Sequence, residues 1–414
     1  MQLSNIIFIS VILIFIFGFI FDRVLSYLNQ NSWKKDLPNQ FKGIYNVEKY
    51  HVAMNYSIIN AKNGALESSL SFVVILLVLY FGGFGKLDAM VNQMFETPIV
   101  RALAFFGVLS IATSMMSIPF SIYSTFVIEE QFGFNRTNLK TFVLDLFKGA
   151  LLSAVFGGLI LSLIVFLYIQ LGASFWWAAW LVMAVFMLFM MLFYSNVIVP
   201  LFNKQTPLEE GELRTSIAEF ARKVGFELEN IYVIDGSKRS TKANAYFTGL
   251  GAKKRIVLYD TLIAGHTTEE LVAILAHEIG HYKNKHTRQS MILSLIQAAL
   301  LLFLLSLFVA PGGTIAQAAA DAIGAEPSFQ VGVLIFGILY TPISTILGIF
   351  MNAISRKNEY EADAFAKEHY SGEHLSQALI KMSVKHLSNL NPHPAFVFVN
   401  YSHPPLLDRL KGLK

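Results

Sequence analysis

Residues 277 to 281 read His-Glu-Ile-Gly-His, a spacing that could build a metal-assisted hydrolytic site. On a helix, residues four apart project from one face, so the imidazoles of His277 and His281 could bind one ion. Glu278 lies beside them, where its carboxylate could accept a proton from a water that the ion activates. The pattern therefore predicts one Zn²⁺ per chain, with His277 and His281 as ligands and Glu278 as the general base.

A catalytic zinc ion takes a third protein ligand and leaves its fourth position to water. Residues 358–363, Asn-Glu-Tyr-Glu-Ala-Asp, offer this ligand. Glu359 and Asp363 are four residues apart, so one helical face could supply a ligand, Glu359, and a carboxylate that orients a histidine, Asp363. The chain has no cysteine, which excludes disulfides and thiolate ligands. The alternative is that the two histidines are ordinary solvated or packed helix residues.

Both segments are expected on helices that continue into a membrane. Thr267, with Glu270 three residues on, forms a possible capping box at the start of the motif helix. Neither Gly nor Pro separates His281 from an apolar run that begins near Met291, so a single helix is expected to connect the motif to that run. Residues 359–363 directly follow another apolar run. Packing these two helices together would assemble the metal site.

The polar insert that contains the motif has a mixed pattern. One buried helical face is indicated by the spacing of Leu213, Ile217, Phe220, Ala221 and Val224. Strand candidates follow at Ile231 to Ile234, Ala245 to Thr248 and Ile256 to Tyr259, with turn signals at Gly249, Gly251 and Lys253. The insert is therefore expected to form a small sheet beside helices.

The composition is that of a polytopic membrane protein. The chain is 54% hydrophobic and 14% charged over 414 residues, whereas soluble domains are about 25% charged. Seven segments are long and apolar enough to span a bilayer: approximately 5–28, 66–85, 102–128, 149–171, 174–199, 290–310 and 330–354. The fourth and fifth are nearly adjacent and should form a tight helical hairpin. The expected fold class is mainly α, with seven transmembrane helices and a small α+β metalloprotease domain on the cytoplasmic side.

These assignments divide the chain into four parts. Residues 1–199 are expected to hold five transmembrane helices and their loops, and residues 200–289 a catalytic insert with the motif helix. Residues 290–354 should form transmembrane helices six and seven. Residues 355–414 should form a cytoplasmic C-terminal part that completes the zinc site.

Loop charges predict the orientation. The loops after the first and third apolar segments are rich in basic residues, including Lys34, Lys35 and Arg136, whereas the opposite side has only Lys86 and Arg101. Because basic residues favour the cytoplasmic side, the insert and the C-terminal tail are expected in the cytoplasm. The net charge of +4 mostly reflects this asymmetry and does not suggest nucleic acid binding. The C-terminal residues 411–414 lack a dilysine retrieval signal, which favours a bacterial inner membrane over the endoplasmic reticulum.

The third apolar segment carries a stripe of hydroxyl groups at helical spacing: Ser110, Thr113, Ser114, Ser117, Ser121, Ser124 and Thr125. Such a stripe is typical of a helix that faces water inside a bundle. Close helix packing through small residues explains it equally well. Glu129 and Glu130 end this segment, and a solvated helix end is the simpler account of them. His286 and several other histidines are likewise expected to be solvated and unliganded.

Further stretches resemble the integral-membrane CAAX prenyl endopeptidase family. They are Ile128 to Asn135 (IEEQFGFN), Pro200 to Lys204 continuing through Thr206 to Glu209, Asn244 to Tyr246, His277 to His281, Glu359 to Asp363, and Ser402 to Pro405. The resemblance covers nearly the whole chain, in the family's order. It implies seven helices around a large water-filled chamber, with a zinc protease domain closing the cytoplasmic end. It also implies His277, His281 and Glu359 as ligands, Glu278 as the base, and substrates that end in a prenylated cysteine and three further residues.

Three more residues are candidates for the site. His403, which two prolines follow, and Asn244, ahead of a strand-like segment, could donate hydrogen bonds to the developing oxyanion. Arg409 could pair with Asp363 or contact substrate. A packed histidine, a capping asparagine and a surface arginine are the alternative interpretations. Residues 244–247 could also offer a strand edge to which an extended peptide adds.

The motif and the resemblance together predict a zinc metalloendopeptidase, similar to CAAX prenyl proteases and embedded in a lipid bilayer. It is expected to hydrolyse peptide bonds near the C-terminus of peptide or protein substrates, prenylated ones included. One alternative is a membrane quality-control metalloprotease, although the five apolar segments before the insert argue against that shorter family. Another is a channel or scaffold with structural zinc. A closed structural site would need a fourth protein ligand, and only three are evident in the sequence.

Overall fold

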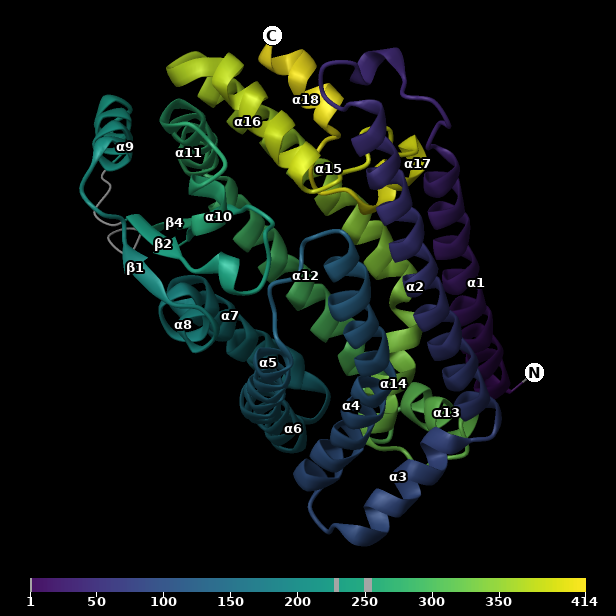
Figure 1. The fold of residues 1–414 in the computed structure, drawn as a ribbon. Coiled ribbons are helices and arrows are strands. Elements are labelled where there is room, and N and C mark those ends of the chain that lie inside the picture. Colours follow the sequence, from purple (N-terminus) through teal and green to yellow (C-terminus); the bar gives the residue numbers. More distant parts are fainter. Residues whose placement is uncertain (1, 227–230, 249–254) are drawn as a thin grey trace.

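The computed structural model describes residues 2–226, 231–248 and 255–414, and most of the chain is helical (Figure 1). The N-terminal half consists of α1 (Leu3–Asn31), η1 (Asn39–Phe41), α2 (Val47–Tyr80), α3 (Gly83–Met94), α4 (Pro98–Tyr123), η2 (Ser124–Glu129), α5 (Leu139–Leu152), η3 (Ser153–Gly157), α6 (Gly158–Leu171), η4 (Gly172–Ser174), α7 (Phe175–Phe193), η5 (Tyr194–Ile198) and α8 (Val199–Phe202).

The polar insert comprises β1 (Gln205–Pro207), α9 (Glu212–Lys223), β2 (Ile231–Ile234), η6 (Gly236–Lys238), β3 (Ala245–Thr248), β4 (Arg255–Tyr259), α10 (Asp260–Ile263) and α11 (Thr268–Lys283). The rest of the chain forms α12 (His286–Val309), α13 (Thr314–Ala322), α14 (Phe329–Leu339), α15 (Thr341–Ala366), η8 (Lys367–Ser371), α16 (Gly372–Lys385), α17 (Pro394–Asn400) and α18 (Leu406–Leu413).

Among the described residues, five helical runs are long and apolar enough to cross a membrane: Leu3–Asn31, Val47–Tyr80, Pro98–Glu129, Leu139–Phe202 and His286–Val309. The pair α14 and α15 is bent by 55° at Tyr340 and makes a sixth run when its two helices are counted as one span. The fourth run turns back on itself near Gly172. Ring contacts of Phe156, before the turn, with Phe186 and Phe189, after it, show that the two helices lie side by side. This is the expected hairpin. The multi-pass, mainly helical fold is confirmed, while the count of seven spans stays a prediction.

The membrane helices bury little of their surface in one another. Between 6% and 11% of the most apolar window is buried in each of the first four runs. Residues 110–115 of α4 are exposed on every side, the hydroxyl-bearing Ser110, Thr113 and Ser114 as well as the apolar Ile111 and Met115. Neighbouring helices therefore do not cover the hydroxyl stripe at this level, which argues against close packing as its explanation.

The insert forms a four-stranded sheet in the order β1-β2-β4-β3. β2 and β4 pair in parallel, with Ile231 opposite Ile256, whereas β1 and β3 are antiparallel edge strands. The predicted strands at 231–234, 245–248 and 256–259 are all present. The predicted turn signals at Gly249, Gly251 and Lys253 lie outside the described residues.

Helix α11 is the centre of the polar part, which gathers at one end of the helical bundle (Figure 1). Its capping box forms as predicted: the Glu270 backbone N–H donates to Thr267 Oγ1, and the Thr267 backbone N–H donates to the Glu270 carboxylate. Leu271, Leu275 and Ile279 are at most 2% exposed and pack in one core with α9, α16 and Ala366. Each such burial contributes about 1.5–3 kcal/mol to folding.

The expectation that one helix carries the motif into the membrane is wrong. Helix α11 ends at Lys283, Lys285 has a left-handed backbone with φ of 61°, and α12 begins at His286. A left-handed residue interrupts the helical hydrogen bonds without needing Gly or Pro, so the composition carried no signal for it. Glu359, in contrast, lies within α15, the second helix of the bent pair, so this acidic segment does continue an apolar helix as expected.

Gly280 allows α11 and α15 to approach closely. A Cβ atom at this position would lie 3.1 Å from Ala362 Cα, 3.1 Å from Phe365 Cβ and 3.2 Å from the Ala362 carbonyl oxygen. Two of these atoms belong to the backbone of α15 and cannot move without moving the helix. The spacing of the two helices therefore depends on the missing side chain.

We expect Gly280→Val to separate α11 from α15 and to lower the free energy of unfolding by about 1–3 kcal/mol, because overpacked contacts cost that much. Thermal unfolding of the purified protein would measure this change. Gly337→Val in α14 is the matched control, since a Cβ atom at that position would meet nothing within 4 Å. Equal losses in the two variants would contradict the close-approach argument.

Candidate metal centre

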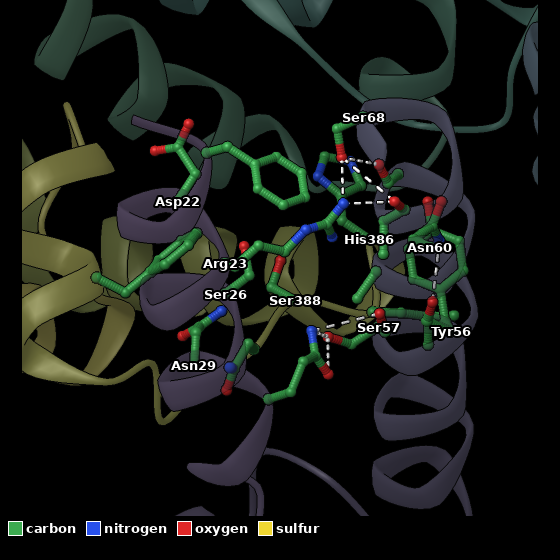
Figure 2. Close-up of a pocket in the computed structure, with 18 residues that line it drawn as sticks. Asp22, Arg23, Ser26, Asn29, Tyr56, Ser57, Asn60, Ser68, His386 and Ser388 are labelled. Atoms are coloured by element: carbon green, nitrogen blue, oxygen red, sulfur yellow. Dashed lines mark hydrogen bonds between the residues drawn. The ribbon is translucent and has the colours of Figure 1, made fainter. Parts of the chain in front are cut away.

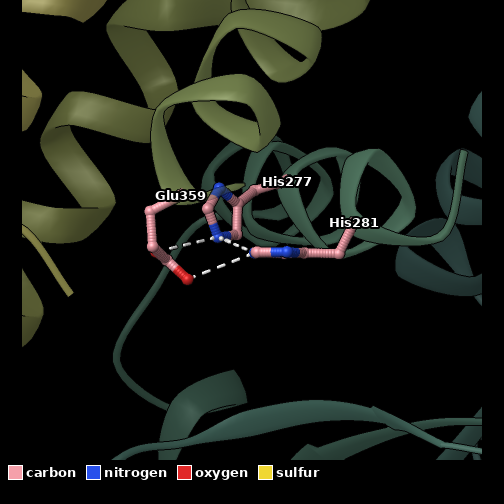
Figure 3. A group of neighbouring side chains, drawn as sticks. All are labelled: His277, His281 and Glu359. Atoms are coloured by element: carbon pink, nitrogen blue, oxygen red, sulfur yellow. Dashed lines mark hydrogen bonds and ion pairs between the residues drawn. The ribbon is translucent and has the colours of Figure 1, made fainter. Parts of the chain in front are cut away.

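Three side chains from α11 and α15 converge on one point (Figure 3). His281 Nε2 lies 3.2 Å from His277 Nε2 and 3.2 Å from Glu359 Oε1, and His277 Nε2 lies 3.5 Å from Glu359 Oε2. A tetrahedral zinc ion with ligand bonds of about 2.0–2.1 Å holds its ligand atoms about 3.3 Å apart. The three side chains therefore have the dimensions of such a site. Glu359 Oε2 is also buried without a hydrogen-bond partner, as a ligand atom would be.

A second group of residues orients these three. Asp363 Oδ1 lies 2.9 Å from His277 Nδ1, so the carboxylate accepts the proton of the ring nitrogen that faces away from the cluster. Arg409 from α18 donates to both Asp363 oxygens, at 2.8 Å and 2.6 Å, and its Nη1 lies 3.3 Å from Glu359 Oε2. The predicted pairing of Arg409 with Asp363 is present. Arg409 thus connects the C-terminal helix to both acidic residues of α15.

The electrostatics of the cluster favour bound positive charge. Burial lowers the pKa of the His277 imidazole, but hydrogen bonds to the Asp363 and Glu359 carboxylates outweigh burial and raise that pKa to about 9. The carboxylates therefore hold a proton where a divalent ion could lie instead. Burial raises the pKa of the Glu278 carboxyl above its usual range, while the neighbouring imidazoles act in the opposite direction. A carboxyl of this kind is suited to accept and return a proton near neutral pH.

The two remaining candidates lie in different surroundings. His403, in the segment between α17 and α18, places Nδ1 3.0 Å from Glu359 Oε1, while its side chain is 67% exposed. Asn244 precedes β3 and is exposed, and its side chain accepts a hydrogen bond from the Ala245 backbone N–H. His403 therefore joins the cluster. Within the described ranges, no contact connects Asn244 to it.

His286 and Glu361 were missed as parts of the site. His286 is 4% exposed, so the expectation that it is solvated is wrong. Its Nδ1 lies 3.0 Å from His281 Nδ1, and its Nε2 lies 2.9 Å from Glu361 Oε2. The helix break at Lys285, which the sequence did not reveal, brings His286 back against the motif. The one available signal was that Glu361 lies between Glu359 and Asp363.

A tether connects the helical bundle to the start of β3. We use this name for the contacts of residues 133–137 with residues 239–242. Asn135 and Ser240 form an isolated antiparallel bridge, and the Thr241 backbone N–H donates to the Phe134 carbonyl oxygen. Arg239 also forms a two-point ion pair with Asp145 of α5, at 2.7 Å and 2.8 Å.

Lys242 anchors the end of the tether nearest β3. Its ammonium donates to Glu129 Oε2 at 2.8 Å and to the Tyr56 hydroxyl at 2.9 Å, and it lies 4.5 Å from the centre of the Phe134 ring. Glu129 is therefore not a solvated helix end but a half-buried anion that pairs with the insert. Its partner lies over 100 residues away in the chain, so no local pattern could have revealed the pairing.

A cavity of about 660 Å³ lies between α1, α2 and the segment that follows α16 (Figure 2). Its lining includes Arg23, Asn60, Tyr56 and His386. His386 Nε2 accepts the Ala243 backbone N–H at 2.9 Å, and burial lowers the pKa of this ring to about 4. The ring is therefore neutral at pH 7. The three converging side chains do not line this cavity. Through His386 it adjoins Ala243, which lies just before β3.

Comparisons with known proteins agree with this arrangement. Residues 26–204 match the family description "CAAX prenyl protease N-terminal, five membrane helices", and residues 207–414 match "Peptidase family M48". The chain is 34% identical to CAAX prenyl protease 1 of Saccharomyces cerevisiae, over 94% of this chain and 91% of that protein. It is 35% identical to the rice homologue (98% and 96%) and 32% identical to the human homologue (82% and 80%). The crystal structure of S. mikatae Ste24p superposes with a TM-score of 0.89 at 34% identity, covering 99% of each chain.

The relatives correct one prediction. They come from yeasts, a plant and a mammal, so the preference for a bacterial inner membrane is wrong. The preference rested on the absence of a dilysine signal from residues 411–414. The absence of one retrieval signal leaves every other means of membrane targeting open, so it cannot identify a host compartment. The multi-pass membrane assignment is unaffected.

Proposed function

The chain belongs to peptidase family M48 and is a membrane-embedded metalloprotease, and from this premise we propose that it cleaves prenylated CAAX-type substrates with one zinc ion held by His277, His281 and Glu359. The observation that carries the proposal is the convergence of these three side chains at ligand spacing, beside the acidic residue of the motif. Relatives named CAAX prenyl proteases, similar over nearly the whole chain, support the substrate class. The substrate would reach the site from the bilayer that surrounds the helices.

The donor set suits zinc. Two imidazoles and one carboxylate are ligands of catalytic zinc sites that keep a fourth position open. A bound ion would supply Lewis-acid chemistry: it lowers the pKa of a water and stabilises an oxyanion. Among the described residues the cluster has three candidate ligands, whereas a closed structural site needs four. This count favours catalysis over a scaffold with structural zinc.

Glu278 acts as the general base. Its carboxylate is close enough to His277, His281 and Glu359 to interact with them electrostatically, and its raised pKa matches a group that takes a proton from the attacking water and returns it to the leaving amine. Asp363 and Arg409 keep the His277 ring in one orientation. His403, 3.0 Å from Glu359, stands where it can donate to the oxygen that gains charge during attack.

The edge of β3 binds the substrate backbone. Among the described strands, β3 pairs with β4 alone, and it contacts α11. An extended peptide can add to such an edge as a further strand, so that its scissile bond lies beside the motif helix. Asn244, at the start of this edge, is exposed and can donate an amide N–H to a bound peptide. The catalytic unit in this proposal comprises residues 200–289 and 355–414.

We predict that Glu278→Gln retains zinc and lowers the cleavage rate by about 10²–10⁴-fold, because a general base contributes that much. The amide keeps the size of the carboxylate but cannot accept the proton. Cleavage of a fluorogenic CAAX peptide and metal analysis of the purified protein would measure both effects. Glu269→Gln, an exposed glutamate on the same helix, is the control and should cleave normally. Cleavage by Glu278→Gln at the parental rate would remove Glu278 from the mechanism.

We also predict that a farnesylated CAAX peptide is cleaved with a KM at least about tenfold lower than its unmodified twin. Burial of only two methylenes contributes about 1.6 kcal/mol, which corresponds to more than a factor of ten. A zinc chelator should abolish cleavage of both peptides, and added zinc should restore it. Equal KM values would show that the lipid is not recognised, although the chain would remain a metalloprotease.

A further inference from the structure

His281 is connected to a second acidic residue through His286. His281 Nδ1 lies 3.0 Å from His286 Nδ1, and His286 Nε2 lies 2.9 Å from Glu361 Oε2. His286 is 4% exposed, and Lys357 Nζ lies 3.6 Å from the other oxygen of Glu361. Three side chains from α11, α12 and α15 thus form a chain of contacts that ends at the cluster.

The proton positions in this series of contacts follow from which atoms can accept a hydrogen bond. An ionised carboxylate can only accept, so Glu361 requires a proton on His286 Nε2. In a neutral imidazole the other nitrogen is then an acceptor, so His286 Nδ1 accepts from His281 Nδ1–H. A proton on His281 Nδ1 leaves the lone pair of Nε2 free. That atom is the one that faces His277 and Glu359.

The backbone accepts strain to make this contact. On an uninterrupted helix, residue 286 would lie five positions after residue 281 and about 140° around the axis from it, so the two side chains would diverge. The left-handed Lys285, with φ of 61°, ends α11 and turns His286 back. A non-glycine residue rarely adopts that conformation, because its Cβ atom comes too close to the following carbonyl oxygen. Strain of this kind gathers where a function requires the geometry.

We propose that His286 and Glu361 are positioning residues that hold His281 in the ring orientation and tautomer that bind metal. The inference deepens the proposed function and rests on His281 being a zinc ligand. Asp363 does the same for His277 directly, at 2.9 Å. The segment 359–363 therefore has a different task for each of its three carboxylates: Glu359 binds, Asp363 orients one imidazole and Glu361 orients the other through His286.

Zinc affinity tests the proposal independently of cleavage. In the full-length protein, His286→Leu removes the acceptor for His281, and loss of such an orienting partner should weaken zinc binding about 10–100-fold. Glu361→Leu should weaken it in the same direction, and its side chain is 43% exposed, so the fold tolerates the change. His286→Gln keeps one acceptor and one donor and should bind within about threefold of the parent. Competition with a chelating dye would give the dissociation constants.

The absorption bands of the cobalt-substituted protein provide a second readout, because they report ligand geometry. They should shift in His286→Leu and stay unchanged in His51→Leu, the control at an exposed histidine. Parental zinc affinity and spectra in His286→Leu and in Glu361→Leu would overturn the inference. Equal weakening in His286→Gln and His286→Leu would also overturn it, since ring volume and not hydrogen bonding would then matter. A parental protein that binds no zinc would instead overturn the proposed function.

Discussion

The contact between α11 and α15 buries acidic side chains that the fold must neutralise. Glu359 and Asp363 are 4% and 3% exposed, and the half-buried Glu278 interacts electrostatically with Glu359 and with both imidazoles. A buried carboxylate is tolerated only when a cation or hydrogen-bond donors compensate it. Arg409 supplies one positive charge, and the proton held by His277 supplies another. A divalent ion in place of that proton would complete the compensation, so the same arrangement that makes the contact costly also suits a metal ion.

The remaining architecture brings these groups to one end of a helical bundle and keeps them there. Gly280 sets the distance between the two helices, and α18 closes the cluster with Arg409. On the other side of α11, the edge strand β3 is held by the tether and by the Lys242 ammonium between Glu129 and Tyr56. The bundle therefore fixes the edge to which a peptide can add, while α11 and α15 fix the reactive groups.

Local patterns predicted the elements and the first layer of the site. The capping box at Thr267, the strands around Ile231 and Ile256, and the four-residue spacings of the histidines and acids all depend on neighbours in the chain. The helix break at Lys285 was not predictable, because no glycine or proline marks it. The tether and the contact between His286 and Glu361 join residues far apart in the sequence. A single sequence contains no sign of such pairs until the helices are packed.

The break also frees the direction of the motif helix from the direction of the apolar helix that follows it. A rigid helix that continued from His277 into the bilayer would fix the direction of both histidines by the tilt of the span. The left-handed Lys285 separates the two directions, so α12 can follow the membrane while α11 follows the core of the insert. His286, the first residue of α12, still contacts His281. The candidate metal ligands are thus connected to α12 through a hydrogen bond and not through a continuous helix, which permits the insert to keep its own packing.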